Sequence, residues 1–149
     1  MAKSMEQVVT ELADREAIRA LPQHYCDCVW HNNIEGLVSL FAEDGAFITR
    51  GRQREHKVAG RPELLKMYGT LTSADVMPRP YIHNHVIELK DDGRASGRCY
   101  VELRDANRDF EWVGTGFYND EYVKQGEHWK FQSRTFTIAH MQRMPGRRA

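Results

Sequence analysis

The second half of the sequence contains four long segments with the composition of β-strands, and these segments constrain the fold more than any other feature. Each is rich in β-branched and aromatic residues, which favour extended structure. The four segments are residues 81–90, 95–104, 110–124 and 128–141. Because turn signals such as Asp91-Asp92-Gly93 and Gln125-Gly126-Glu127 separate neighbouring segments, we predict a meander of long antiparallel strands.

The first half of the sequence has helical periodicity instead. Apolar residues recur at helical spacing over residues 8–29, behind two plausible N-caps, Ser4 and Asp14. Pro22 lies inside this run and predicts a kink or a break, because proline removes a backbone donor. Two further helices are expected, over residues 34–41 and from Gly60 to Leu71.

Between these two helices the sequence predicts a turn at Glu43-Asp44-Gly45, a short strand at 46–49 and a polar loop or hairpin at 50–60. Helices followed by a meander of strands are the α+β pattern. We therefore predict one α+β domain over residues 1–149, with N-terminal helices packed on a strongly bent, mostly antiparallel sheet. Such a sheet leaves a cone-shaped hollow that suits an apolar ligand.

Composition argues against several classes of protein. The 21 Lys and Arg residues balance the 21 Asp and Glu residues, so nucleic acid is not an expected partner. No segment reaches the roughly 18 apolar residues of a membrane span, and the N-terminus lacks a signal-peptide pattern. The odd number of cysteines fits the reducing cytoplasm, where we expect the protein. The spacing of Cys26 and Cys28 does not suit a zinc site, so no metal is expected.

Four stretches of the sequence carry a resemblance to a known family. They are Arg15–Leu21 with Tyr25, Trp30–Phe41 with Glu43-Asp44-Gly45, Asn84–Leu89 with Asp92–Ala95, and Tyr122 with Trp129-Lys130-Phe131 and Arg134. On these residues the chain resembles the SnoaL-like branch of the nuclear transport factor 2-like superfamily, which includes polyketide cyclases, scytalone dehydratase, bile-acid dehydratase and a dehydrochlorinase. The resemblance implies a single SnoaL-like domain with a cone-shaped α+β barrel, no cofactor, and assembly as a homodimer or homotrimer.

The dehydratases of this family usually pair an Asp near the end of the first helix with a His at the start of the first long strand. In this sequence the two positions fall on Trp30 and Pro80. Neither side chain can accept and return a proton. The chain therefore departs from the usual dyad, and any proton transfer has to be carried by other residues.

Four residues are candidates for catalysis. The resemblance places Tyr25 and Tyr118 in the pocket, and it matches Arg134 to an arginine that the dehydrochlorinase uses near its leaving group. His83, with its neighbour His85, is a candidate base. Both histidines have the opposite strand parity to the family's histidine position, so only a bulge or a late strand start would turn His83 into the cavity. The structural alternatives are core tyrosines, a surface or interface histidine, and a salt bridge within the domain.

The expected pocket lining comes largely from the same resemblance. The candidates are Trp30, Thr49, Pro80, Cys99, Val101, Leu103, Phe136 and Ile138, with Phe117 nearby or in the core behind them. Trp30 either offers a flat wall for stacking on an aromatic ligand or packs in the core. Cys99 falls where scytalone dehydratase has a second histidine.

A basic stretch separates the helical half from the strands. It consists of Arg50, Arg52, Arg54, His56, Lys57 and Arg61, with Glu55 as its single acid. This stretch is either a solvated hairpin or a rim that attracts an anionic or phenolic ligand. Three more arginines, Arg143, Arg147 and Arg148, follow the last acid of the chain.

The function that these residues predict is that of a small enzyme. We expect a cofactor-independent lyase or isomerase that abstracts a proton from a hydrophobic, aromatic small molecule, as a dehydratase or by retro-aldol C–C cleavage. Two alternatives stay open: a non-catalytic accessory subunit, resembling the β subunit of ring-hydroxylating dioxygenases, and a small-molecule-binding protein. A pocket lined by Tyr25, Arg134 and an ionisable group would favour the enzyme, whereas a cavity filled by Trp30 and Leu103 would favour the subunit.

Overall fold

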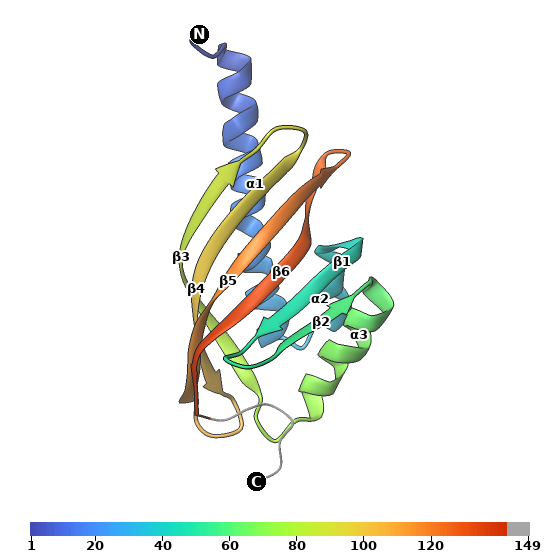
Figure 1. Cartoon of the computed structure of the whole chain (residues 1–149), viewed down its shortest axis with the longest axis vertical. Coiled ribbons are helices and arrows are strands. Elements are labelled where there is room, and N and C mark those ends of the chain that lie inside the picture. Colours follow the sequence, from blue (N-terminus) through green and yellow to red (C-terminus); the bar gives the residue numbers. More distant parts are fainter. Residues whose placement is uncertain (143–149) are drawn as a thin grey trace.

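The structure, a computed structural model, describes residues 1–142 and confirms the α+β class (Figure 1). The helices are α1 (Met5–Trp30), α2 (Ile34–Ser39), α3 (Arg61–Thr70) and the short 3₁₀ helix η1 (Leu71–Ser73). The strands are β1 (Phe41–Arg50), β2 (Glu55–Ala59), β3 (Pro78–Leu89), β4 (Arg94–Asp105), β5 (Glu111–Gln125) and β6 (His128–Met141). The four long strands of the second half therefore begin and end within three residues of their predicted limits.

All six strands form one curled sheet in the order β2-β1-β6-β5-β4-β3 (Figure 1). The strands from β3 to β6 make the expected antiparallel meander, and β2 pairs antiparallel with β1. Among the described strands only the pairing of β1 with β6 is parallel, and it places Phe47 opposite Arg134. The inner face of the sheet is covered by α1, which packs on β3 and β6, and by α3, which packs on β1 and β2.

The first helix begins at a capping box and continues through its proline. Ser4 accepts a hydrogen bond from Gln7 N at 3.2 Å, and Gln7 Oε1 accepts one from Ser4 N at 2.8 Å. Of the kink or break predicted at Pro22, the break is absent, because α1 is one helix of 26 residues. Its buried face, which includes Ile18 and Tyr25, holds it against the sheet and offsets the missing donor. Within residues 1–142, no helix has the length and apolar character that a membrane crossing requires.

Asp14 lies in the middle of α1 rather than at an N-cap. Its Oδ1 accepts hydrogen bonds from Trp129 Nε1 and Lys124 Nζ, both at 2.8 Å. Burial raises the pKa of Asp14, but these two bonds and the charge of Lys124 outweigh it and hold the pKa below its usual value. The carboxylate therefore fastens α1 to the end of the β5–β6 hairpin.

Residues 43–45 lie inside β1 and do not form the expected turn. The pairing of β1 with β6 changes register between Phe41 and Ala46, which marks a bulge. A Cβ atom on Gly45 would lie 3.0 Å from the carbonyl oxygen of Phe131, so the close approach of the two strands requires glycine there. The basic stretch that follows folds as the β1–β2 hairpin.

Candidate functional site

The inner face of the sheet, α1 and α3 surround a mostly apolar cavity of about 340 Å³. Seven of the residues expected in the site line it: Tyr25, Thr49, Pro80, Leu103, Tyr118, Phe136 and Ile138. Six apolar residues that the sequence did not single out complete much of the wall: Val29, Phe47, Met67, Leu71, Pro78 and Met141. Within residues 1–142, no Asp, Glu, Lys or Arg side chain lines this cavity. Its volume is at the lower end of the range for small-molecule sites.

Five residues that the sequence proposed for the site lie outside the cavity wall. They are Trp30, His83, Cys99, Val101 and Arg134. Cys99 and Val101 are core residues of β4, and His83 is exposed on β3. A ligand in the cavity therefore meets two of the four catalytic candidates, the two tyrosines.

Trp30 packs behind the cavity wall and does not offer it a stacking surface. Its Nε1 donates a hydrogen bond to Pro80 O at 2.8 Å. Its ring stacks on Phe110 with the centroids 5.3 Å apart and 9° between the planes, and Tyr81 meets it edge-on at 5.3 Å. Trp30 thus fixes the start of β3 instead of filling the cavity, while Leu103 forms part of the wall.

Tyr25 and Tyr118 place phenol groups on the cavity wall. The hydroxyls of Tyr25 and Tyr68 lie 2.9 Å apart and share a hydrogen bond. The hydroxyl of Tyr118 makes no hydrogen bond to any residue between 1 and 142. Burial raises the pKa of Tyr25 and of Tyr118 well above the ordinary value, so both phenols stay neutral. They are suited to donate hydrogen bonds to a ligand, not to act as bases.

His56, an exposed residue of β2, also lines the cavity, and the sequence placed it only in the basic stretch. The β1–β2 hairpin pairs it with Thr49, and both line the cavity. Directly opposed residues of an antiparallel pair point to the same face, so the hairpin register is the signal that locates His56. It is the one imidazole among the described lining residues, and histidine is the side chain that most often moves protons in enzymes.

Arg134 is buried behind the two cavity tyrosines and does not reach a ligand. It is 0% exposed, and its Nε lies 3.2 Å from Oδ1 of Asp120, which is 1% exposed. Its Cζ lies 3.6 Å from the ring centroid of Tyr118 and 4.3 Å from that of Tyr25. The observed arrangement is therefore a salt bridge within the domain, with the guanidinium stacked against the phenols from behind.

Asp120 extends this buried polar network toward β3. Its Oδ2 accepts a hydrogen bond from Tyr122 OH at 3.0 Å, and Tyr122 OH lies 3.0 Å from His85 Nε2. Because the Tyr122 proton goes to Asp120, His85 Nε2 is the donor of the second bond. Burial, together with the charges of Arg134 and Arg19, lowers the pKa of His85 to about 4, so this ring is neutral at pH 7.

A bulge in β3 decides which histidine faces the interior. Ile82 pairs with Val101 and His85 with Cys99, so β3 has one residue more than β4 between these two pairs. The extra residue reverses the strand parity after Ile82. It turns His85 inward and leaves His83 exposed, which gives His83 no access to the cavity.

Gly97 of β4 lies so close to β3 and to His85 that a side chain there would not fit. A Cβ atom there would lie 2.8 Å from Val86 O and 3.0 Å from His85 Nε2. We expect Gly97→Ala to lower the free energy of unfolding by about 1–3 kcal/mol, because β3 backbone has to move. Urea denaturation measures this difference. Gly69→Ala on α3, where a Cβ meets nothing within 4 Å, is the control, and equal effects of the two variants would contradict the packing argument.

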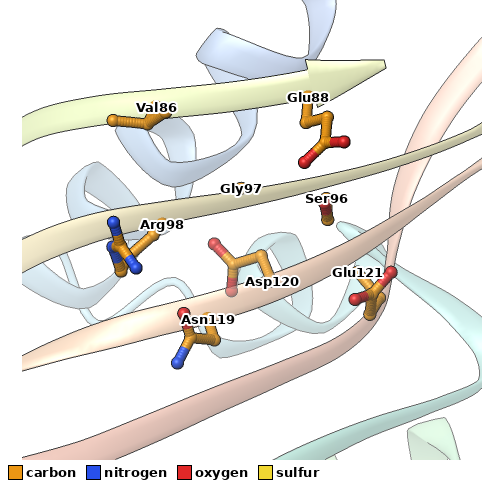
Figure 2. Close-up of a pocket in the computed structure, with 8 residues that line it drawn as sticks. All are labelled: Val86, Glu88, Ser96, Gly97, Arg98, Asn119, Asp120 and Glu121. Carbon is orange, nitrogen blue, oxygen red and sulfur yellow. The ribbon is translucent and has the colours of Figure 1, made fainter. Parts of the chain in front are cut away.

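A second hollow, of about 330 Å³, lies on the outer face of the sheet. Figure 2 shows it between β3, β4 and β5, with the side chains of Glu88, Arg98 and Glu121 around it. It is lined mainly by polar and charged groups, and it lies on the opposite side of the sheet from the cavity phenols. We therefore take the inner cavity as the candidate site.

The family profile of the SnoaL-like domain matches residues 10–135. No curated protein matches the sequence. One similar solved structure is a variant of Rv3472, a protein of unknown function from Mycobacterium tuberculosis. It is 25% identical to this chain, with a TM-score of 0.79, and the alignment covers 93% of this chain and 79% of that one.

Two structures from Novosphingobium aromaticivorans have the same fold with a TM-score of 0.75 each. The β subunit of a candidate aromatic-ring-hydroxylating dioxygenase is 20% identical, with coverage of 89% of this chain and 93% of that one. A candidate scytalone dehydratase is 21% identical, with 89% of each chain covered. Since the family profile matches most of the sequence, this chain belongs to the SnoaL-like domain family.

Proposed function

We propose that the protein is a cofactor-independent lyase or isomerase that binds a hydrophobic, aromatic small molecule in the inner cavity and moves a proton within it. One observation carries this proposal. An apolar cavity of about 340 Å³ has two phenols and one imidazole on its wall, from Tyr25, Tyr118 and His56. In sites of this kind the apolar wall supplies binding energy, and a few polar groups orient the ligand.

The hydroxyl of Tyr118 is the donor best suited to a ligand oxygen. It is not engaged by any residue between 1 and 142, whereas the hydroxyl of Tyr25 is shared with Tyr68. The guanidinium of Arg134, 3.6 Å from the Tyr118 ring centroid, favours negative charge near this ring. A hydrogen bond from Tyr118 would therefore strengthen as a carbonyl oxygen of the ligand becomes an enolate.

His56 acts as the base, because Trp30 and Pro80, which occupy the positions of the family's usual Asp and His, cannot accept a proton. In a dehydration, the imidazole takes the proton from the carbon beside the ligand carbonyl, and the enolate oxygen accepts a hydrogen bond from Tyr118. The C–O bond to the neighbouring hydroxyl then breaks as the carbon–carbon double bond forms. The imidazolium returns its proton to the leaving oxygen, which departs as water, so no outside reactant is needed.

A second candidate function rests on the same two family positions. Trp30 and Pro80 cannot transfer protons, and the β subunit of a candidate dioxygenase is among the structural neighbours. In that case the chain is a non-catalytic accessory subunit or a binding protein, and it binds ligand without forming product. We also propose a cytoplasmic homodimer or homotrimer, which size-exclusion chromatography with light scattering tests, since an accessory subunit requires a different partner.

Filling the cavity should abolish both ligand binding and turnover. A panel of aromatic alcohols and β-hydroxy ketones is incubated with the purified chain and followed by mass spectrometry for loss of water or formaldehyde. Ile138→Trp places a larger ring in the wall and should reduce binding and turnover about tenfold or more. Phe117→Trp, outside the cavity wall on the adjacent strand, is the matched control and should change neither. Full activity of Ile138→Trp would contradict the proposed site.

A further inference from the structure

We infer that the ligand of the inner cavity is an aromatic anion, with its ring inside the cavity and its negative charge at the β1–β2 hairpin. The inference rests on the proposed function in one respect, because it concerns the same cavity. Three features carry it: an uncharged wall, a hairpin with unpaired cations, and the direct continuity between the two.

The cavity wall offers no counter-charge to a charged group in its interior. Among residues 1–142, no ionised Asp, Glu, Lys or Arg lines it. Arg134 is fully buried behind the tyrosines and is already paired with Asp120 at 3.2 Å. Since an unpaired charge is costly to bury, a charged ligand has to keep its charge at the mouth and insert its ring.

The β1–β2 hairpin supplies positive charge that nothing described neutralises. The single acid of its basic stretch, residues 50–61, is Glu55, and it is engaged by Arg50, with 2.9 Å between Glu55 Oε2 and Arg50 Nε. Within residues 1–142, Arg52, Arg54 and Lys57 form no ion pair. A cationic ligand would be repelled at this edge, whereas an anion would be attracted.

The hairpin is the direct continuation of the cavity wall. Thr49 and His56 face each other across the two strands and both line the cavity. Gly51 N donates to Arg54 O at 2.9 Å and closes the turn two residues beyond them. At roughly 3.3 Å per residue, the backbone of Arg52 lies about 10 Å beyond Thr49, which is about one Debye length at 0.1 M salt. The charges of Arg52 and Arg54 therefore act on a ligand group at this end of the cavity.

Two fluorescent probes that differ by one anionic group test the inference. The anion 1-anilinonaphthalene-8-sulfonate and the neutral N-phenyl-1-naphthylamine share the same ring system. Both are titrated into wild type, into Arg52→Gln/Arg54→Gln, and into Lys3→Gln/Lys90→Gln. The last variant loses the same charge at sites outside the hairpin and cavity. Ile138→Trp is included to show that both probes occupy the cavity.

We expect the hairpin variant to raise the Kd of the anionic probe about fivefold to tenfold and to leave the Kd of the neutral probe within about twofold. The control variant should leave both values unchanged. Raising sodium chloride from 20 to 300 mM should also weaken binding of the anionic probe to wild type, by about fivefold to tenfold. The hairpin variant should lose most of this salt dependence.

Two results would overturn the inference, and they differ in what they say about the cavity. If the neutral probe binds and is blocked by Ile138→Trp, but the anionic probe ignores the hairpin variant, the charge preference is wrong and the proposed function is untouched. If neither probe binds wild type, or Ile138→Trp blocks neither, the cavity is not the ligand site and the proposed function fails as well.

Discussion

Replacing Asp120 with alanine should lower the free energy of unfolding by about 3–5 kcal/mol, the usual cost of leaving one buried charge without its partner. Asp120 and Arg134 are 1% and 0% exposed and lie 3.2 Å apart, so water cannot solvate the charge that remains. Tyr122 also loses the acceptor of its hydroxyl proton. Urea denaturation followed by circular dichroism measures the loss. Glu121→Ala changes the next residue, whose side chain is 56% exposed, and should cost less than about 1 kcal/mol.

Removing both charges together should cost less than removing the acid alone. The double variant Asp120→Leu/Arg134→Met leaves no uncompensated charge in the core and keeps most of the buried volume. We expect it to be more stable than Asp120→Ala by at least about 1 kcal/mol, since coupled neighbours are not additive. The single variants Asp120→Leu and Arg134→Met complete the comparison. If the loss of stability in the double variant equals the sum of the losses in these two, the pair is not coupled.

His56→Gln should lower kcat by about a hundredfold to ten-thousandfold, the usual contribution of one general acid–base group. Glutamine keeps the size and polarity of the side chain, so KM should change little. Steady-state kinetics on a substrate from the aromatic panel gives both constants. His83→Gln, exposed on the β3 bulge and away from the cavity, is the matched control and should behave as wild type.

The two histidine variants also decide between the proposed functions. If kcat is the same in both, His56 is not the base, although ligand binding in the cavity is unaffected by that result. If wild type binds members of the panel without converting any of them, the accessory or binding role is the better description. The stability of each variant, measured alongside, separates a lost proton transfer from a lost fold.

Most of the fold could be predicted because its signals are local. Alternating apolar and aromatic segments with turn residues between them mark the four long strands, and the capping box at Ser4 marks the start of α1. Two of the local departures from expectation have a common cause. Pro22 does not break α1 and residues 43–45 do not turn, because packing against distant parts of the chain overrides the local preference.

The site was harder to predict because local sequence does not determine the register in which strands pair. Asp120 meets Arg134 only through the register of β5 and β6, so the sequence suggested a ligand contact where a buried ion pair lies. One extra residue in β3 turns His85 inward, whereas His83 stays exposed. His56 was placed in a basic stretch, and only its pairing with Thr49 brings it to the cavity.

The parallel pairing of β1 with β6 affects the order in which the chain can assemble. Phe47 and Arg134 are sheet neighbours, yet they come from opposite ends of the chain. As the chain leaves the ribosome, β3, β4 and β5 can pair while they emerge, but β1 and β2 have no place in the sheet until β6 has been made. Residues of both β1 and β6 line the cavity, so the cavity can form only after these two strands have paired, in the last stage of folding. Until then the edge of β1 that pairs with β6 has no strand partner.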